Sequence, residues 1–209
     1  ADLLAMLPEN PEFAMLDLDF RHLFASWFNR GFLVLRPINW ETPAEILEKI
    51  IAYEAVHAID SWEDLRRRVQ PEDRRCFAFF HPAMPNEPLI FVEVALTRGV
   101  PGSVQALLAK GRDVLEAEKA DTATFYSISN CQSGLAGISF GNSLIKQVAA
   151  DLSTELAGLK TFVPLSPIPG LMRWHAAQEA PPPIDTPEAL RATAAHYLLK
   201  AKTEGAAPL

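Results

Sequence analysis

The chain has 209 residues, of which 49% are hydrophobic and 22% charged, enough for one sizeable core or for one domain with a remnant of another. Its net charge of −7 excludes nonspecific nucleic-acid binding, which depends on clustered cations. Two cysteines exclude a disulfide framework and indicate a reducing compartment, and no apolar run is long enough to span a bilayer.

The N-terminal part of the chain reads as helical. Apolar residues recur through residues 1–30 with interruptions at Pro8 and Pro11, as expected for the end of a preceding helical domain. A short strand is predicted over 32–38. Two helices follow, one starting at Thr42-Pro43-Ala44-Glu45 with Thr42 as N-cap, and one starting at Ser61. We expect the arginine run 66–68 in the second helix to be a solvated face.

The middle and end of the chain alternate between strands and helices, which predicts an α/β or α+β layered domain. An antiparallel strand pair joined by a loop with several prolines is expected first, and a linker or exposed loop precedes the last helix. The predicted strands are 76–80, 89–97, 122–129 and 159–165, the helices are 105–108, 144–152 and 187–202, and the linker is 176–187.

The segment from Thr122 to Gly170 is the most informative for function. It reads as strand, glycine-bearing loop, helix and strand, a right-handed crossover whose helix start is expected to face a ligand with free amides and a positive dipole end. Asn142 or Ser143 is the expected helix cap. The loop matches neither common nucleotide-binding glycine motif but contains Q-x-x-G-x-G at 132–137, so a phosphate site and a simple chain turn both remain open.

Ser166 lies at the end of the last strand, before Pro167-Ile168-Pro169-Gly170. Pro167 pushes it toward extended geometry, and the residues behind it force a turn. In a crossover of this kind the strand end shares an edge with the glycine loop, so we expect the hydroxyl beside the anion site. The alternative is a serine that bonds its own backbone in a turn.

Several ordered motifs resemble the malonyl-CoA decarboxylase family over about residues 12–174. SPIPG at 166–170 is the most specific. The others are SWF at 26–28, GFL at 31–33, EAVH at 54–57, RRC at 74–76, EPL at 87–89, VALT at 94–97, FYSIS at 125–129, Q-x-G-L-x-G at 132–137 and LIK at 144–146.

The resemblance implies a GNAT-like acyl-CoA-binding fold with a mixed central sheet, comprising 31–209 and preceded by the end of a helical domain at 1–30. It implies decarboxylation of malonyl-CoA to acetyl-CoA and CO₂, with Ser166 catalytic. It also implies a homo-oligomer, commonly a tetramer, with acyl-CoA as the small-molecule partner. Coenzyme contacts are implied for Gly134, Ala136, Gly137, Ile138, Ser139, Phe140, Gly141 and Asn142.

The family's second catalytic residue is a histidine in a segment like F-H-L-x-N-G-A, and this sequence has no such segment. We therefore expect the chain to be incomplete at its C-terminus. His57 lies in one of the family motifs, EAVH at 54–57, but we expect it to end a helix, where capping explains it better than catalysis. No histidine or cysteine spacing supports a metal site.

No separate cofactor is expected, because the thioester carbonyl of the substrate can itself accept the electrons released with CO₂. Lys110, Arg112 and Lys146 are candidate sources of positive field for the coenzyme phosphates, or ordinary surface charges. We expect a cytoplasmic location, with an organelle as the alternative. Two other functions remain open, an acyl-CoA-dependent N-acyltransferase and a noncatalytic acyl-CoA-binding module.

Overall fold

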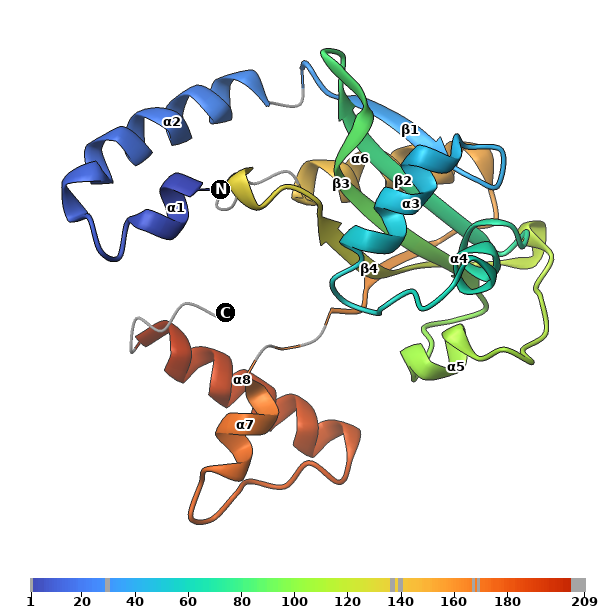
Figure 1. Ribbon diagram of the computed structural model, residues 1–209. Helices are drawn as coiled ribbons and strands as arrows, with labels where there is room; N and C mark the ends of the chain where they lie inside the picture. Colours follow the sequence, from blue (N-terminus) through green and yellow to red (C-terminus); the bar gives the residue numbers. More distant parts are fainter. Residues whose placement is uncertain are drawn as a thin grey trace. The chain divides into compact units, whose positions relative to one another are not determined.

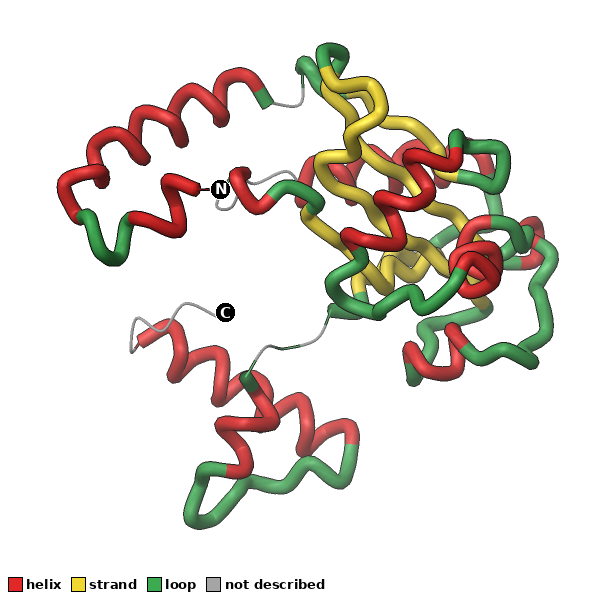
Figure 2. Tube along the Cα trace, in the orientation of Figure 1, coloured by secondary structure: helices red, strands yellow, loops and turns green. Residues whose placement is uncertain are grey.

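The computed structural model describes residues 2–28, 31–135, 138, 141–166, 168 and 170–203. The chain divides into two compact units, Ala1–Leu165 and Ser166–Leu209. Each unit has its own secondary structure, shown along the chain in Figure 1 and by type in Figure 2. No helix among the described residues is long and apolar enough to cross a membrane.

The first unit begins with helices, as predicted. Helix α1 (Asp2–Met6) and helix α2 (Ala14–Trp27) are separated by the proline-containing stretch that the sequence marks as a break. Phe28 follows α2 and packs against the core, with its ring 5.4 Å from that of His81. Several large apolar side chains of α2 are exposed, Met15, Leu18 and Trp27 among them.

A five-stranded mixed sheet forms the centre of the first unit, with its strands in sequence order. The first four strands are antiparallel neighbours, and only the last pair is parallel. The layered α/β fold class is therefore confirmed. The strands are β1 (Val34–Ile38), β2 (Arg74–His81), β3 (Met84–Thr97), β4 (Thr122–Asn130) and β5 (Thr161–Pro164).

The connection between β2 and β3 is shorter than predicted. The expected loop over 81–88 was wrong, because β3 already begins at Met84, and Pro85 and Pro88 lie within this strand. Register shifts on either side of Phe80, which is paired with Pro88, show how the strand accommodates them. Proline is tolerated in a strand where an irregularity removes the need for its missing N–H.

Helices cover both faces of the sheet (Figure 1). Helix α6 (Gly141–Glu155) buries Leu144, Val148 and Leu152 against one face, as the apolar spacing predicts. The opposite face is covered by α3 (Ala44–Tyr53) and α4 (Trp62–Val69). The short helix α5 (Val104–Leu108), which follows β3 in the sequence, packs on the same face through Leu107.

The helix starts agree only in part with their sequence signals. Ser61 caps α4 as expected, with its hydroxyl accepting a hydrogen bond from the Asp64 amide at 3.2 Å. Thr42 does not cap α3. The N-cap position is Pro43, and the Thr42 hydroxyl instead accepts a hydrogen bond from the amide of Asn39.

The second unit is a pair of helices, α7 (Leu171–Ala176) and α8 (Pro187–Thr203). Helix α8 agrees with the prediction, whereas α7 was not expected. The two contact each other through Trp174, whose ring centre is 5.4 Å from that of Tyr197. Gly170 precedes α7 with φ of +76°, and a Cβ there would come 2.7 Å from the Tyr197 hydroxyl. This position therefore requires glycine.

Candidate functional site

The predicted crossover is present. Strands β4 and β5 pair in parallel from Thr122–Thr161 to Phe125–Pro164, and α6 lies between them in sequence. The amide of Leu165 donates to the carbonyl of Phe125 at 2.8 Å, which extends the pairing by one step. Helix α6 begins at Gly141, so Asn142 and Ser143 lie in its first turn, and the expected cap at either residue was wrong.

Only part of the proposed coenzyme loop can be described. Gly134 belongs to the turn Ser133–Leu135, and Ile138 is half-buried against the core on the α6 side. Asn142 is exposed in the first turn of α6. The other predicted contact residues, Ala136, Gly137, Ser139 and Phe140, lie outside the described residues, and Gly141 is the first residue of α6.

The start of this loop is fixed to β3. The Cys131 amide donates to the Leu89 carbonyl at 3.0 Å, and the Gln132 side chain donates to Glu87 at 2.7 Å. A pocket of about 290 Å³ lies beside it, lined by Phe24, Phe28, Met84, Leu89 and the loop residues 132–135. The first glycine of the loop therefore faces a mostly apolar concave surface.

Glu87 links the loop to α3. Its carboxylate accepts hydrogen bonds from Gln132 and from the Tyr53 hydroxyl at 2.8 Å, and pairs with Lys49 at 2.7 Å. Partial burial raises the pKa of Glu87, but the hydrogen bonds from Lys49, Tyr53 and Gln132 outweigh burial and lower it. The glutamine of the Q-x-x-G-x-G run thus has an anchoring contact that the motif alone did not reveal.

Ser166 is the first residue of the second unit, and its side chain is exposed. It follows directly on Leu165, the last residue held by β4. Pro167 and Pro169 lie outside the described residues. The expected position of the Ser166 hydroxyl beside the coenzyme loop therefore stays a prediction.

Strand β4 contains a bulge that the sequence did not predict. Val94 pairs with Phe125 and Glu93 with Ser127, so Tyr126 is an extra residue on β4. A bulge of this kind turns two consecutive side chains toward one face. Accordingly Tyr126 packs with Ala95 on the face opposite α6, and Ser127 also points to the α3 side, where it contacts Glu54.

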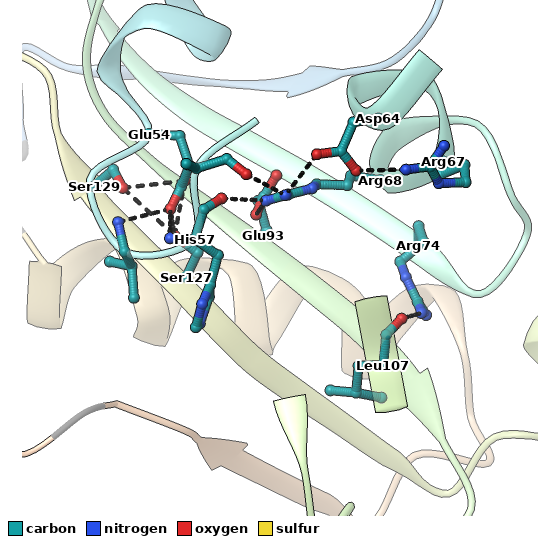
Figure 3. Close-up of polar contacts among 12 residues, drawn as sticks. Glu54, His57, Asp64, Arg67, Arg68, Arg74, Glu93, Leu107, Ser127 and Ser129 are labelled. Carbon is teal, nitrogen blue, oxygen red and sulfur yellow. Dashed lines mark hydrogen bonds and ion pairs between the residues drawn. The ribbon is translucent and has the colours of Figure 1, made fainter. Parts of the chain in front are cut away.

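Glu54 connects the end of α3 to β4 (Figure 3). Its carboxylate accepts hydrogen bonds from the hydroxyls of Ser127 at 2.7 and 2.8 Å and of Ser129 at 3.1 Å. It also accepts from the amides of Val56 and His57, at 2.9 and 2.7 Å. Sequence reasoning missed this contact, although two serines at alternate positions of a buried strand indicate a shared polar partner.

His57 does not end a helix, so the expected capping role was wrong. Helix α3 ends at Tyr53, and Glu54 is its C-cap in an extended conformation. His57 instead lies in the connection to α4, where its carbonyl accepts from Arg68 at 2.7 Å. Its ring centre lies 6.3 Å from that of Tyr126.

Arg68 is buried, which contradicts the expected solvated face for the whole arginine run. Only 4% of it is exposed, whereas Arg66 stays on the surface. Its guanidinium lies between Asp64, at 3.0 Å, and the fully buried Glu93, at 3.3 Å (Figure 3). It also donates to the Ala58 carbonyl at 2.8 Å.

Burial raises the pKa of Glu93 to about 8, with the charge of Glu54 adding to the rise and Arg68 opposing it. The folded protein therefore holds a proton on Glu93 at pH values where the unfolded chain, with a carboxyl pKa near 4.5, has released it. This contribution to stability is complete below about pH 4.5 and is lost as the pH rises through about 8.

We expect the free energy of unfolding to fall between pH 6 and 7 by up to about 1.4 kcal/mol relative to Glu93→Gln, which cannot ionise. Urea denaturation of both proteins at several pH values measures this difference. Glu63→Gln, on the exposed side of α4, is the matched control and should not change the pH dependence. A constant difference between wild type and Glu93→Gln would contradict a raised pKa at this carboxyl.

The three basic side chains considered as sources of positive field for the coenzyme phosphates differ in exposure and in pairing. Arg112 forms a two-point ion pair with Asp73, whose second contact measures 2.8 Å, so its charge is already paired within the protein. Lys146 is exposed on α6, and Lys110 is exposed after α5. Among the described residues, no group of three or more histidine, cysteine and acidic side chains could hold a metal ion.

The mixed sheet, the helices on both of its faces and the β4–loop–α6–β5 crossover define a layered α/β domain in keeping with a GNAT-like fold. The family model "Malonyl-CoA decarboxylase C-terminal domain" matches residues 31–203, and "Malonyl-CoA decarboxylase N-terminal domain" matches residues 1–28. The chain belongs to the malonyl-CoA decarboxylase family.

Solved structures and curated relatives agree with this assignment. Malonyl-CoA decarboxylase from Rhodopseudomonas palustris is 58% identical with a TM-score of 0.78, over 83% of this chain and 42% of that one. The protein from Agrobacterium vitis is 60% identical with a TM-score of 0.77, over 84% and 44%. The mitochondrial protein of Anser anser anser is 42% identical over 82% of this chain and 34% of its own length, so the chain spans about a third of that relative.

Proposed function

We propose that the protein decarboxylates malonyl-CoA to acetyl-CoA and CO₂, and that this chain supplies the acyl-CoA-binding part of the active site. The observation that carries the proposal is the family match over residues 31–203, which includes the whole β4–loop–α6–β5 crossover. The relatives named as malonyl-CoA decarboxylases align with 82% and 83% of this chain.

The coenzyme diphosphate binds at the start of α6 in this proposal. The first-turn amides of a helix lack carbonyl partners and lie at its positive dipole end, which favours an anion. Gly134, Ala136, Gly137, Ile138, Ser139, Phe140, Gly141 and Asn142 supply the backbone around it. Lys146 is the nearby exposed cation on the same helix.

The extended arm of the coenzyme runs along β4. The described pairing of β4 with β5 ends at Phe125 and the Leu165 amide, whereas β4 continues to Asn130. Beyond Phe125 the described pairs of β4 are with β3 alone. An amide-bearing chain can add to such an edge in the way that a peptide adds a strand to a sheet.

The chemistry needs no separate cofactor. Loss of CO₂ leaves an enolate on the thioester carbonyl, so the protein has to stabilise an oxyanion and deliver one proton to carbon. Ser166 orients the malonyl carboxylate with its hydroxyl or relays a proton. The general acid is a histidine outside this chain, in agreement with the family resemblance.

Product analysis tests the proposed reaction. The complete gene product is expected to release CO₂ and acetyl-CoA from malonyl-CoA alone, measured by carbon dioxide capture and by chromatography of the coenzyme esters. Acyl transfer that occurs only when an amine is added would assign an N-acyltransferase instead. Saturable coenzyme A binding with no turnover would assign a noncatalytic module.

We also propose that the protein forms a homo-oligomer, with four copies as the expected number, and that it is located in the cytoplasm. Exposed apolar side chains on α2, such as Met15 and Leu18, are available for burial against further protein. Light scattering of the complete gene product measures the number of copies. Fractionation of the source cells measures the compartment.

A further inference from the structure

Four buried side-chain atoms on the α4 side of the sheet have no hydrogen-bond partner among the described residues. They are Nε2 of His57, Nε of Arg68, Oε1 of Glu93 and the hydroxyl of Tyr126. Glu93 and Tyr126 are fully buried. Elsewhere in the described part of the chain, Trp174 is the one other residue with such an atom, and it belongs to the second unit.

These four residues form one contiguous group, named here the Tyr126 cluster. Arg68 donates to Glu93 at 3.3 Å and to the carbonyl of His57 at 2.7 Å. The rings of His57 and Tyr126 lie 6.3 Å apart. Burial raises the pKa of Tyr126 well above its usual value. Among the nearby charges, that of Glu93 adds most to this rise, so the two side chains lie close enough to interact electrostatically.

An unpaired polar atom in a protein interior is costly, and native proteins rarely keep one. Four in one group would be a large fraction of the stability of a domain. The atoms also complement one another in chemistry. Arg68 Nε–H can only donate, whereas the carboxyl group of Glu93, which is protonated below about pH 8, the Tyr126 hydroxyl and His57 Nε2 can each donate or accept.

The ligand for such a group has to be small, neutral and able both to donate and to accept. A cation is opposed by the guanidinium of Arg68, and an anion is opposed by the carboxyl group of Glu93 once it ionises. Water meets every requirement and commonly makes two to four bonds to buried polar groups. We propose that the Tyr126 cluster is a binding site for one or more buried water molecules.

The proposed water gives the bulge in β4 a physical support. Tyr126 is the extra residue of that bulge, and the bulge brings both Tyr126 and Ser127 to the face on which Glu54 lies. A water molecule bonded to the Tyr126 hydroxyl and to Arg68 or Glu93 would hold the strand to α4. This inference does not depend on the proposed reaction.

Tyr126→Phe separates a hydrated site from a dry one by the sign of its effect. If water binds the hydroxyl, the Tm of the complete gene product falls by about two degrees or more, because a bonded partner is lost. If the site is dry, the Tm stays the same or rises, because an unpaired buried hydroxyl has been removed. Tyr53→Phe is the matched control, since its hydroxyl donates to Glu87 at 2.8 Å and its loss calibrates one hydrogen bond.

A crystal structure of the complete gene product gives a second, independent result. Spherical density within hydrogen-bonding distance of at least two of the four atoms supports the proposal. Direct pairing of the four atoms with protein groups, or no density together with an unchanged or raised Tm for Tyr126→Phe, overturns it. The crystal result stands even if the variant folds poorly.

Discussion

Arg68→Ala is expected to lower the free energy of unfolding by about 3–5 kcal/mol, because it leaves buried charged and polar groups without their partner. Glu93, which is fully buried, loses the hydrogen bond that Arg68 donates to it at 3.3 Å. The carbonyls of His57 and Ala58 and the carboxylate of Asp64 lose hydrogen bonds at 2.7, 2.8 and 3.0 Å. Urea denaturation of the complete gene product measures the change.

Arg66→Ala is the control for this experiment. Arg66 lies on the same helix but is exposed, with a 3.7 Å contact to Glu63, and such surface pairs contribute at most about 1 kcal/mol. A double variant, Arg68→Met with Glu93→Leu, should recover most of the stability that Arg68→Ala loses, because an apolar pair leaves no unpaired charge. Equal losses for Arg68→Ala and Arg66→Ala would contradict the buried position of Arg68.

The burial of Arg68 could have been predicted from its spacing. Leu65, Arg68 and Val69 stand at i, i+3 and i+4 of α4, and all three are buried. Charge alone led to the wrong expectation that the arginine run is solvated. The helical spacing therefore indicates that Arg68 is buried. It does not indicate that Glu93 is its partner, because Glu93 lies on a strand far along the sequence.

The crossover was predictable because each of its parts has a local signal. The alternation through β4 and the single apolar face of α6 both follow from the geometry of one element. The bulge at Tyr126 has no such signal, since it depends on how β4 meets β3. The Glu54 contact with Ser127 likewise depends on the path of the chain after α3.

Only the location of the candidate site could be predicted, because the order of the strands and the helix along the chain determines it. The end of β4, the start of α6 and the end of β5 follow from the crossover, so the edge that carries the loop was correctly placed. The sequence did not predict which charged side chains pair with one another. The ion pair between Arg112 and Asp73 is an example. Gln132 was singled out for its motif, whereas its contact is an anchoring bond to Glu87.

Ser166→Ala is expected to lower kcat by about a hundredfold or more, while the dissociation constant for coenzyme A changes little. The serine stands one residue beyond Leu165, the last residue bonded to β4, and the following proline limits it to extended geometry. In the proposed reaction its hydroxyl acts on the malonyl group alone, so the loss falls on turnover. Acetyl-CoA release and calorimetric titration with coenzyme A measure the two quantities.

Ser153→Ala provides the control, because Ser153 is an exposed serine on α6 whose hydroxyl donates only to the Ala150 carbonyl at 2.8 Å. Both quantities should stay at wild-type values in that variant. An unimpaired kcat in Ser166→Ala would remove Ser166 from the reaction. Loss of coenzyme A binding together with turnover would assign the serine to binding, since uniform binding energy does not act on the chemical step.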